Sequence, residues 1–126
     1  MNSDHQITLA VLTAGGLVAL AIQGLHAQAK PPAYVITEVE IIDQTAYKEF
    51  GPKVSATYQP FGGKYLVRGG EVVAMDGEAP KRVVVVVFEN MAKAQAWRNS
   101  AAWKELAPLR AKAVKAREYI ADGFPG

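Results

Sequence analysis

Arg68 and the two glycines that follow it are the strongest candidates for chemistry in this chain. Arg68 ends an apolar stretch, and Gly69 and Gly70 come directly after it. A guanidinium group offers a two-pronged donor to a carboxylate or phosphate, and glycines allow a backbone to approach a ligand closely. This spacing predicts an anion-binding site at Arg68, Gly69 and Gly70. The alternative is a structural ion pair of Arg68 with Glu71 or with a second copy of the chain.

Glu38 is the candidate general base. It alternates with Val35, Val39 and their neighbours, so it lies on the less apolar face of a predicted strand over residues 34–41. If this face lines a cavity, loss of water would raise the pKa of Glu38 and allow the carboxylate to accept a proton. Tyr34 shares this face and would orient a substrate through its hydroxyl. The alternative is a carboxylate held in an ion pair, without a catalytic role.

Two aromatic residues complete the predicted ligand-binding site. Tyr65 precedes Arg68 by three positions and offers a hydroxyl, while Trp97 would form a flat wall for a ligand. The alternative for both side chains is packing in the core. We expect Ser100 to cap a helix and not to act as a nucleophile, because no histidine is available to activate it.

The histidines and cysteines narrow the chemistry further. The chain has no cysteine and two histidines, His5 and His26, both of which precede Lys30. From Lys30 onward, thiol nucleophiles, Ser-His-Asp triads and metal sites built from histidine or cysteine are therefore excluded. We predict no cofactor and no metal site. The net charge of +2, from 14 basic and 12 acidic residues, gives no electrostatic footprint for nucleic acid.

Residues 1–29 predict a signal peptide. Residues 7–22 are uncharged and largely apolar, and they are fewer than the ~20 residues needed to span a bilayer. Ala27 and Ala29 form a small-x-small cleavage site. We therefore expect a periplasmic or secreted protein with one domain over residues 30–126. Because residues 1–6 contain no Lys or Arg, the alternative is a retained anchor that would hold the chain at a membrane.

The hydrophobic periodicity of residues 30–126 predicts the order β-α-β-β-α-β. This order is typical of the ferredoxin-like α+β fold, a four-stranded antiparallel sheet with helices on one face. Asp43 and Asn90 are the expected N-caps of the helices. The predicted strands cover residues 34–41, 64–68 with a continuation over 71–75, 82–88 and 117–121, and the predicted helices cover the segment from 43 to Gly62 and residues 91–99, the latter followed by two short helical pieces.

Residues 83–87 are five consecutive valines, which predicts a central strand that is apolar on both faces. Helices can cover only one face of such a sheet. We expect a second copy of the chain to cover the other face, which gives a homodimeric α/β-barrel. The alternative is a monomer whose open face is partly polar.

The segment GGKYLVRGGE at residues 62–71, together with Trp97 and Pro108, resembles the domain-of-unknown-function family numbered 1330. The resemblance covers about residues 33–122. That family belongs to the dimeric α/β-barrel superfamily, so the resemblance implies a ferredoxin-like fold and a dimer. Proteins on this barrel include cofactor-free monooxygenases, muconolactone-type isomerases, haem-degrading enzymes and ligand sensors, so no single activity is implied.

Two functions fit these patterns. The first is binding of a small, partly apolar or anionic molecule, with cofactor-free proton transfer or oxygen chemistry as its catalytic extension. It predicts a pocket that reaches both Arg68 and Glu38, with Glu38 secluded from water. The second is a non-catalytic binding or assembly domain whose main role is dimerisation. It predicts that these two side chains are exposed or paired.

Overall fold

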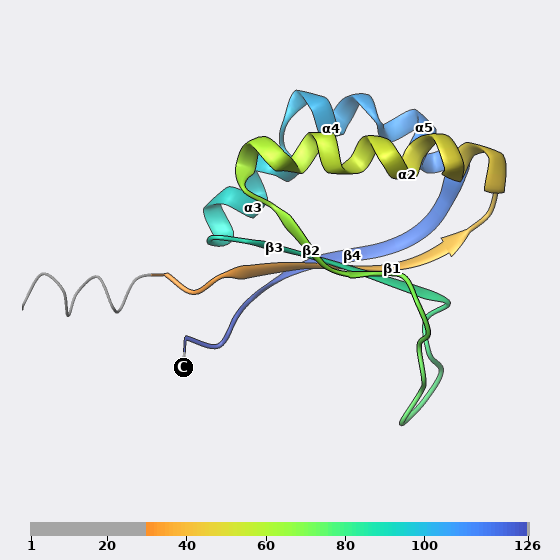
Figure 1. Ribbon diagram of the computed structural model, residues 1–126, viewed down its shortest axis with the longest axis horizontal. Coiled ribbons are helices and arrows are strands. Elements are labelled where there is room, and N and C mark those ends of the chain that lie inside the picture. Colours follow the sequence, from red (N-terminus) through yellow and green to blue (C-terminus); the bar gives the residue numbers. More distant parts are fainter. Residues whose placement is uncertain (1–29, 126) are drawn as a thin grey trace, which may run out of the picture. The chain divides into compact units, whose positions relative to one another are not determined.

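The computed structural model describes residues 30–125, which form a four-stranded antiparallel sheet in the order β2-β3-β1-β4. The helices all lie on one face of this sheet (Figure 1). The predicted ferredoxin-like α+β fold is therefore confirmed. The elements are β1 (Ala33–Ile41), α2 (Gln44–Tyr58), η1 (Gln59–Phe61), β2 (Lys64–Arg68), β3 (Arg82–Phe88), α3 (Met91–Arg98), α4 (Ala101–Glu105), α5 (Ala107–Ala113) and β4 (Val114–Asp122).

The predicted signal peptide and its cleavage site lie outside the described residues. Within the described part of the chain, no helix is both long and apolar enough to cross a membrane.

Alternation along the strands separates two faces of the sheet. Val35 of β1 pairs with Val86 of β3 and with Ile120 of β4, and these side chains face the helices. We call this the inner face, and the opposite side, which carries Ile36 and Val85, the outer face. Because successive strand residues point to opposite sides, the buried core and the uncovered surface come from the same strands.

Helix α2 begins and ends at the predicted signals. The Asp43 carboxylate accepts a hydrogen bond from the Ala46 amide at 2.9 Å, which caps the first turn. The helix continues through Pro52 and buries Phe50 and Tyr58 against the sheet. After η1, Gly62 adopts a φ of 80°, a left-handed conformation that glycine tolerates without steric cost and that turns the chain toward β2.

The second helical region consists of three short helices. Asn90 caps α3, and Ser100 caps α4 by accepting a hydrogen bond from the Trp103 amide at 3.3 Å. The predicted capping role of Ser100 is thus confirmed. Trp97 stacks on Phe88 with a centroid distance of 5.5 Å, and its indole nitrogen donates to Thr57 Oγ1 at 2.9 Å. These contacts join α3 to β3 and α2.

The predicted strand over residues 71–75 is wrong. Gly69 and Gly70 have φ values of 77° and 95°, which turn the chain out of the sheet after Arg68. Residues 69–81 instead form an extended connection, here called the arm, which projects away from the helices (Figure 1). Met75, near the bend of the arm, is 90% exposed. Apolar alternation in residues 71–75 misled the prediction because the two glycines decide the direction of the chain.

The predicted bounds of the last strand were too short. β4 starts at Val114, directly after α5, because Val114 pairs with Ile41 and is buried at the end of the sheet. The interior position predicted for β3 is confirmed. Its outer-face valines, Val83, Val85 and Val87, are half-buried in the single chain.

Candidate functional site

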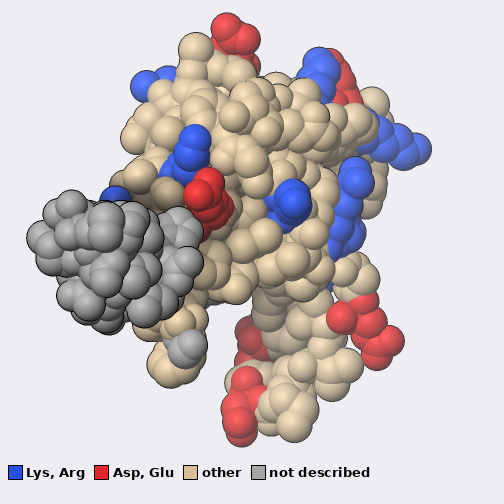
Figure 2. All heavy atoms as spheres, turned by 60° about the vertical axis from the view of Figure 1, so that its left-hand side comes forward, with Lys and Arg blue, Asp and Glu red and all other residues tan. Residues whose placement is uncertain are grey.

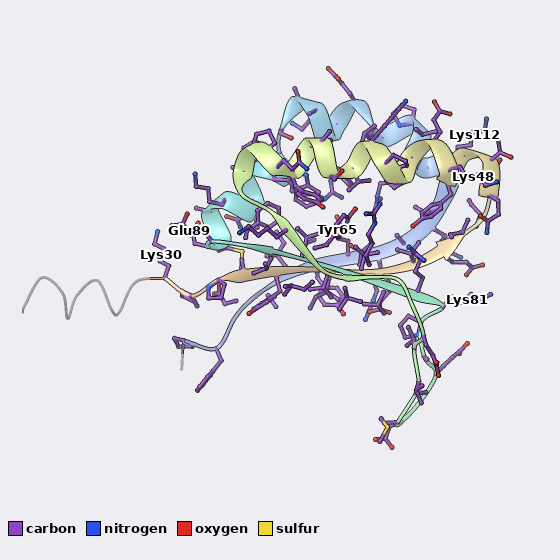
Figure 3. All side chains as sticks on the ribbon, in the orientation of Figure 1. Lys30, Lys48, Tyr65, Lys81, Glu89 and Lys112 are labelled. Atoms are coloured by element: carbon purple, nitrogen blue, oxygen red, sulfur yellow. The ribbon has the colours of Figure 1, made fainter. Side chains whose placement is uncertain are left out.

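A cavity of about 290 Å³ lies between the inner face of the sheet and α2. All four strands contribute to its lining, together with α2, α3, α4 and α5. Its floor consists of aliphatic side chains of β1 and β3, among them Val35, Val84 and Val86. Figure 3 shows Tyr65 of β2 in the layer between the sheet and α2. The volume is near the lower end of the range of about 300–1,000 Å³ that is usual for ligand pockets.

Aromatic side chains form one wall of this cavity. The rings of Trp97 and Trp103 lie 4.8 Å apart between centroids, and Phe50 meets Trp103 edge-on at 6.4 Å. Tyr47 and Tyr65 line other parts of the cavity. Flat apolar groups pack well against such a wall.

Four cationic side chains also line the cavity, against one carboxylate. They are Lys48, Arg68, Arg82 and Arg110, and the carboxylate is Glu118. Each of the three arginines lies over an aromatic ring, at 4.7 to 5.6 Å from the ring centroid. Such cation–π contacts hold the guanidinium groups in place without neutralising their charge.

Glu118 is fully engaged by protein groups. Its carboxylate accepts a hydrogen bond from Thr37 Oγ1 at 2.7 Å and from Arg98 Nε at 2.8 Å. Its side chain is 10% exposed. The negative charge of Glu118 is therefore balanced by Arg98, and the cations that line the cavity keep an excess of positive charge.

Behind Tyr65, the Tyr58 ring fills the core. The two rings meet edge-on at 5.2 Å between centroids. Burial raises the pKa of the Tyr58 phenol, and the neighbouring Tyr65 hydroxyl adds to this effect. Tyr58 is thus a neutral packing residue at ordinary pH.

Three of the predicted ligand-binding residues, Arg68, Tyr65 and Trp97, line the cavity. Arg68 lies over the Tyr65 ring. A Cβ atom at Gly69 would overlap the Arg82 guanidinium group, whereas one at Gly70 would meet nothing within 4 Å. Gly69 therefore makes room for a protein side chain.

Glu38 and Tyr34 lie on the outer face and do not line this cavity. Glu38 accepts hydrogen bonds from Arg117 at 2.9 Å and from the Tyr119 hydroxyl at 3.0 Å. The Arg117 guanidinium, followed by the Tyr119 hydroxyl, lowers the pKa of Glu38. In the single chain this is the opposite of the raised pKa predicted for a general base, because the neighbouring strand supplies a cation that the sequence of β1 does not reveal.

A comparison with protein families identifies the relatives of this fold. Residues 32–124 match the family described as a domain of unknown function (DUF1330). The chain belongs to this family. The resemblance seen in the segment from Gly62 to Glu71 is thus confirmed, and the cavity described above is a site in a DUF1330 domain. A comparison with curated proteins gives no match.

Solved structures with this fold include proteins of unknown and of known activity. The protein RPA0582 from Rhodopseudomonas palustris, of unknown function, is 16% identical with a TM-score of 0.63, over 84% of this chain and 92% of that one. SnoaB from Streptomyces nogalater, a cofactor-independent oxygenase, is 9% identical with a TM-score of 0.52, over 76% of this chain and 95% of that one. At these identities the similarity shows a shared fold.

Several residues that line the cavity, among them Arg82 and Glu118, were not among the predicted site residues. Both stand at inner-face positions, where Arg82 alternates with Val84 and Val86, and Glu118 alternates with Ala116. A charged residue is uncommon at a strand position that faces the apolar side of the sheet, unless it is paired or binds a ligand. The signal available in the sequence of this DUF1330 member was that each charged residue alternates in phase with the apolar residues of its strand.

Proposed function

We propose that this DUF1330 protein binds a small, partly apolar or anionic molecule in the cavity between the sheet and α2. The observation that supports this most strongly is the composition of the cavity lining. Aromatic rings such as Trp97 and Trp103 stand beside cationic side chains such as Arg68, without an equal number of carboxylates. Pockets with this pairing of apolar walls and a few convergent polar groups are typical ligand sites.

Binding is favoured over proton-transfer catalysis by the state of the carboxylates. The carboxylate that lines the cavity, Glu118, already accepts hydrogen bonds from Thr37 and Arg98. Glu38, the candidate base, is held by Arg117 on the other face. SnoaB is a cofactor-independent oxygenase, and only its fold supports similar oxygen chemistry here. The proposal is therefore ligand binding, to which such a reaction would be a further step.

Intrinsic fluorescence tests the binding proposal, because the chain has two tryptophans and both line the cavity. We expect saturable quenching of this emission by naphthoate. Val84→Phe should abolish the quenching, because Val84 lines the cavity and a larger side chain would fill it. Ala92→Phe, at an exposed position of α3 outside the cavity, is the control. If naphthoate and its neutral alcohol, naphthalene methanol, both fail to bind the native protein, the proposal is wrong.

We further propose that two copies pair through their outer faces. Ile36, Val83, Val85 and Val87 form a half-buried apolar centre there, and no described element covers it. The arm projects on the same side of the sheet, so it would run along the edge of a second copy (Figure 1). Figure 2 shows acidic side chains on the arm. A second copy would meet these with Lys115, an outer-face cation that takes part in no ion pair among the described residues.

Sedimentation velocity tests the pairing. We expect the wild-type protein to sediment as a dimer, and Val85→Glu to sediment as a folded monomer because a carboxylate would be buried without a partner. Lys104→Glu, at an exposed position of α4, is the control and should remain dimeric. A wild-type protein that is monomeric at all accessible concentrations would refute the proposal.

Export of the protein is also a proposal, supported by the apolar residues 7–22 and the site at Ala27 and Ala29. Mass spectrometry of the protein from the exported fraction should give a chain that begins at Lys30. An intact chain found in the membrane fraction would favour the retained anchor. Native mass spectra of the same sample would also reveal a co-purified ligand.

A further inference from the structure

We propose that Arg82 anchors the carboxylate of a small aromatic acid in the cavity, an inference that rests on the ligand-binding function proposed above. Arg82 opens β3 and lies on the inner face, where it pairs in register with Val39. It is half-buried and lines the cavity. The missing hydrogen-bond partners and the packing of its guanidinium group support this role.

Arg82 is half-buried, and its guanidinium group lacks the hydrogen-bond partners that groups removed from water ordinarily have. Among the described residues, Arg82 Nε is the one buried side-chain nitrogen or oxygen that has no hydrogen-bond partner. The hydrogen bond that the group does make, to the Arg68 carbonyl oxygen, has a length of 3.5 Å, at the weak limit. No carboxylate of the described chain lies within 4.0 Å of it. Buried charges in proteins are ordinarily paired, so an anion from outside the chain is the missing partner.

The residues around Arg82 hold its guanidinium group in place but accept few of its hydrogen bonds. The guanidinium group lies over the Tyr47 ring at 5.6 Å from the centroid. On its other side it packs against the backbone at Gly69, where any larger residue would overlap it. Tyr47 and Gly69 thus fix the position of a guanidinium group whose donors remain available to a ligand.

The rest of the cavity lining indicates the size, shape and charge of the part of the ligand beyond its carboxylate. The aromatic wall of Trp97 and Trp103 suits a flat ring, and the valines of the floor offer it an apolar surface. A volume of about 290 Å³ admits one or two fused rings and is too small for a larger polycyclic system. Arg68 and Arg110 add positive potential, which excludes cationic ligands.

A carboxylate fits this site better than a phosphate. One guanidinium edge matches the two oxygens of a carboxylate. A phosphate dianion is best held by several converging cationic donors, whereas each arginine of the cavity lies over a different aromatic ring. The predicted ligand class is therefore an aromatic monocarboxylate.

Titration of tryptophan fluorescence with three matched probes tests this assignment. Naphthoate should bind about tenfold more tightly than naphthalene methanol, and more tightly than naphthyl phosphate. Arg82→Gln should remove about tenfold of the naphthoate affinity and leave the alcohol unchanged. Lys93→Gln, which removes one exposed positive charge outside the cavity, is the control and should behave as wild type.

A second pair of variants retains the charge of Arg82 and changes only its position. Gly69→Ala should displace the guanidinium group and weaken naphthoate binding, whereas Gly77→Ala should not, since its Cβ would meet nothing within 4 Å. The two glycines have similar φ values, 77° and 70°, so the backbone strain is matched. This comparison remains informative if Arg82→Gln does not fold.

The outcomes separate the two proposals. Equal affinity for naphthoate and the alcohol, or equal losses for both in Arg82→Gln, would overturn the anchor and leave the ligand-binding function standing. Tighter binding of naphthyl phosphate would show that the ligand class is wrong. Absence of binding by all three probes would overturn the proposed function itself.

Discussion

The two faces of the sheet are built from the same strands, but they treat charge in opposite ways. On the outer face, Glu38 of β1 is matched by Arg117 and Tyr119 of β4, both within 3.0 Å. On the inner face, Arg68, Arg82 and Arg110 line a cavity in which the carboxylate, Glu118, is already engaged by Arg98. The outer face is locally balanced, and the inner face is left with excess positive charge.

This difference in charge balance indicates that an anionic ligand would stabilise the inner face and not the outer face. A balanced ion pair on a half-covered surface needs nothing further, and its net contribution to stability is small. An unbalanced cation in a partly buried cavity is costly in the free protein, and the cost is relieved when an anion binds. The same alternation of residues thus produces one face suited to pairing and another suited to binding.

Adjacent valines of β3 give the largest contrast between the faces. Val86 is 4% exposed on the inner face, so Val86→Ala should lower the free energy of unfolding by about 2 kcal/mol at any protein concentration. Val87→Ala removes the same atoms from the outer face and should cost less than about 1 kcal/mol in the monomer. Urea denaturation at several protein concentrations measures both. If the outer faces pair, only the Val87→Ala loss should grow with concentration.

Removal of the Glu118 charge should increase the excess of positive charge on the inner face relative to the outer face. Glu118→Gln should lower the free energy of unfolding by about 1–2 kcal/mol, less than for a fully buried pair because Arg98 is 41% exposed. The same change should strengthen naphthoate binding severalfold, since it removes the carboxylate that lines the cavity, and leave naphthalene methanol binding unaffected. Thermal unfolding and fluorescence titration check the two effects. Weaker naphthoate binding would contradict an excess of positive charge in the cavity.

The smallest expected effect concerns the pH response of the outer face. The pKa of Glu38 is lowered in the folded chain, mainly by Arg117, so the ionised carboxylate stabilises the fold. This contribution is present above the unfolded-state pKa and is lost as the pH falls through the folded-state pKa. The stability difference between wild type and Glu38→Gln should therefore shrink toward acidic pH.

An NMR titration of the Glu38 side chain measures this pKa directly. We expect a value below the ordinary 4.5. Arg117→Gln, which removes the partner, should return the value toward normal. A value raised above the ordinary one in the assembled protein would restore Glu38 as a candidate base and would remove the contrast between the faces.

Much of the fold could be predicted because its signals are local. The alternation in β1, the helical stripe that contains Phe50 and Tyr58, and the caps at Asp43, Asn90 and Ser100 all lie within a few residues of the structure they specify. The failures have equally physical reasons. Residues 71–75 alternate like a strand, but they have no partner once Gly69 and Gly70 redirect the chain.

The site was predicted less completely because it depends on register between distant strands. Arg68, Tyr65 and Trp97, singled out from the sequence for their guanidinium, hydroxyl and flat ring, line the same cavity. The pairing of Glu38 with Arg117 joins residues 79 positions apart. No pattern within β1 could indicate that β4 would supply this cation directly opposite.

By itself the sequence determined the order of the elements, the helix caps, the alternation of the strands, and the lack of histidine and cysteine from Lys30 onward. These follow from side-chain types and short-range periods, which act along the chain. The tertiary structure alone decided that Arg82 would lie unpaired against Gly69 and Tyr47 while Glu38 would be neutralised on the other face. The physical reason is that burial and electrostatic pairing depend on which distant residues meet in space, and only the assembled sheet and helices set those contacts.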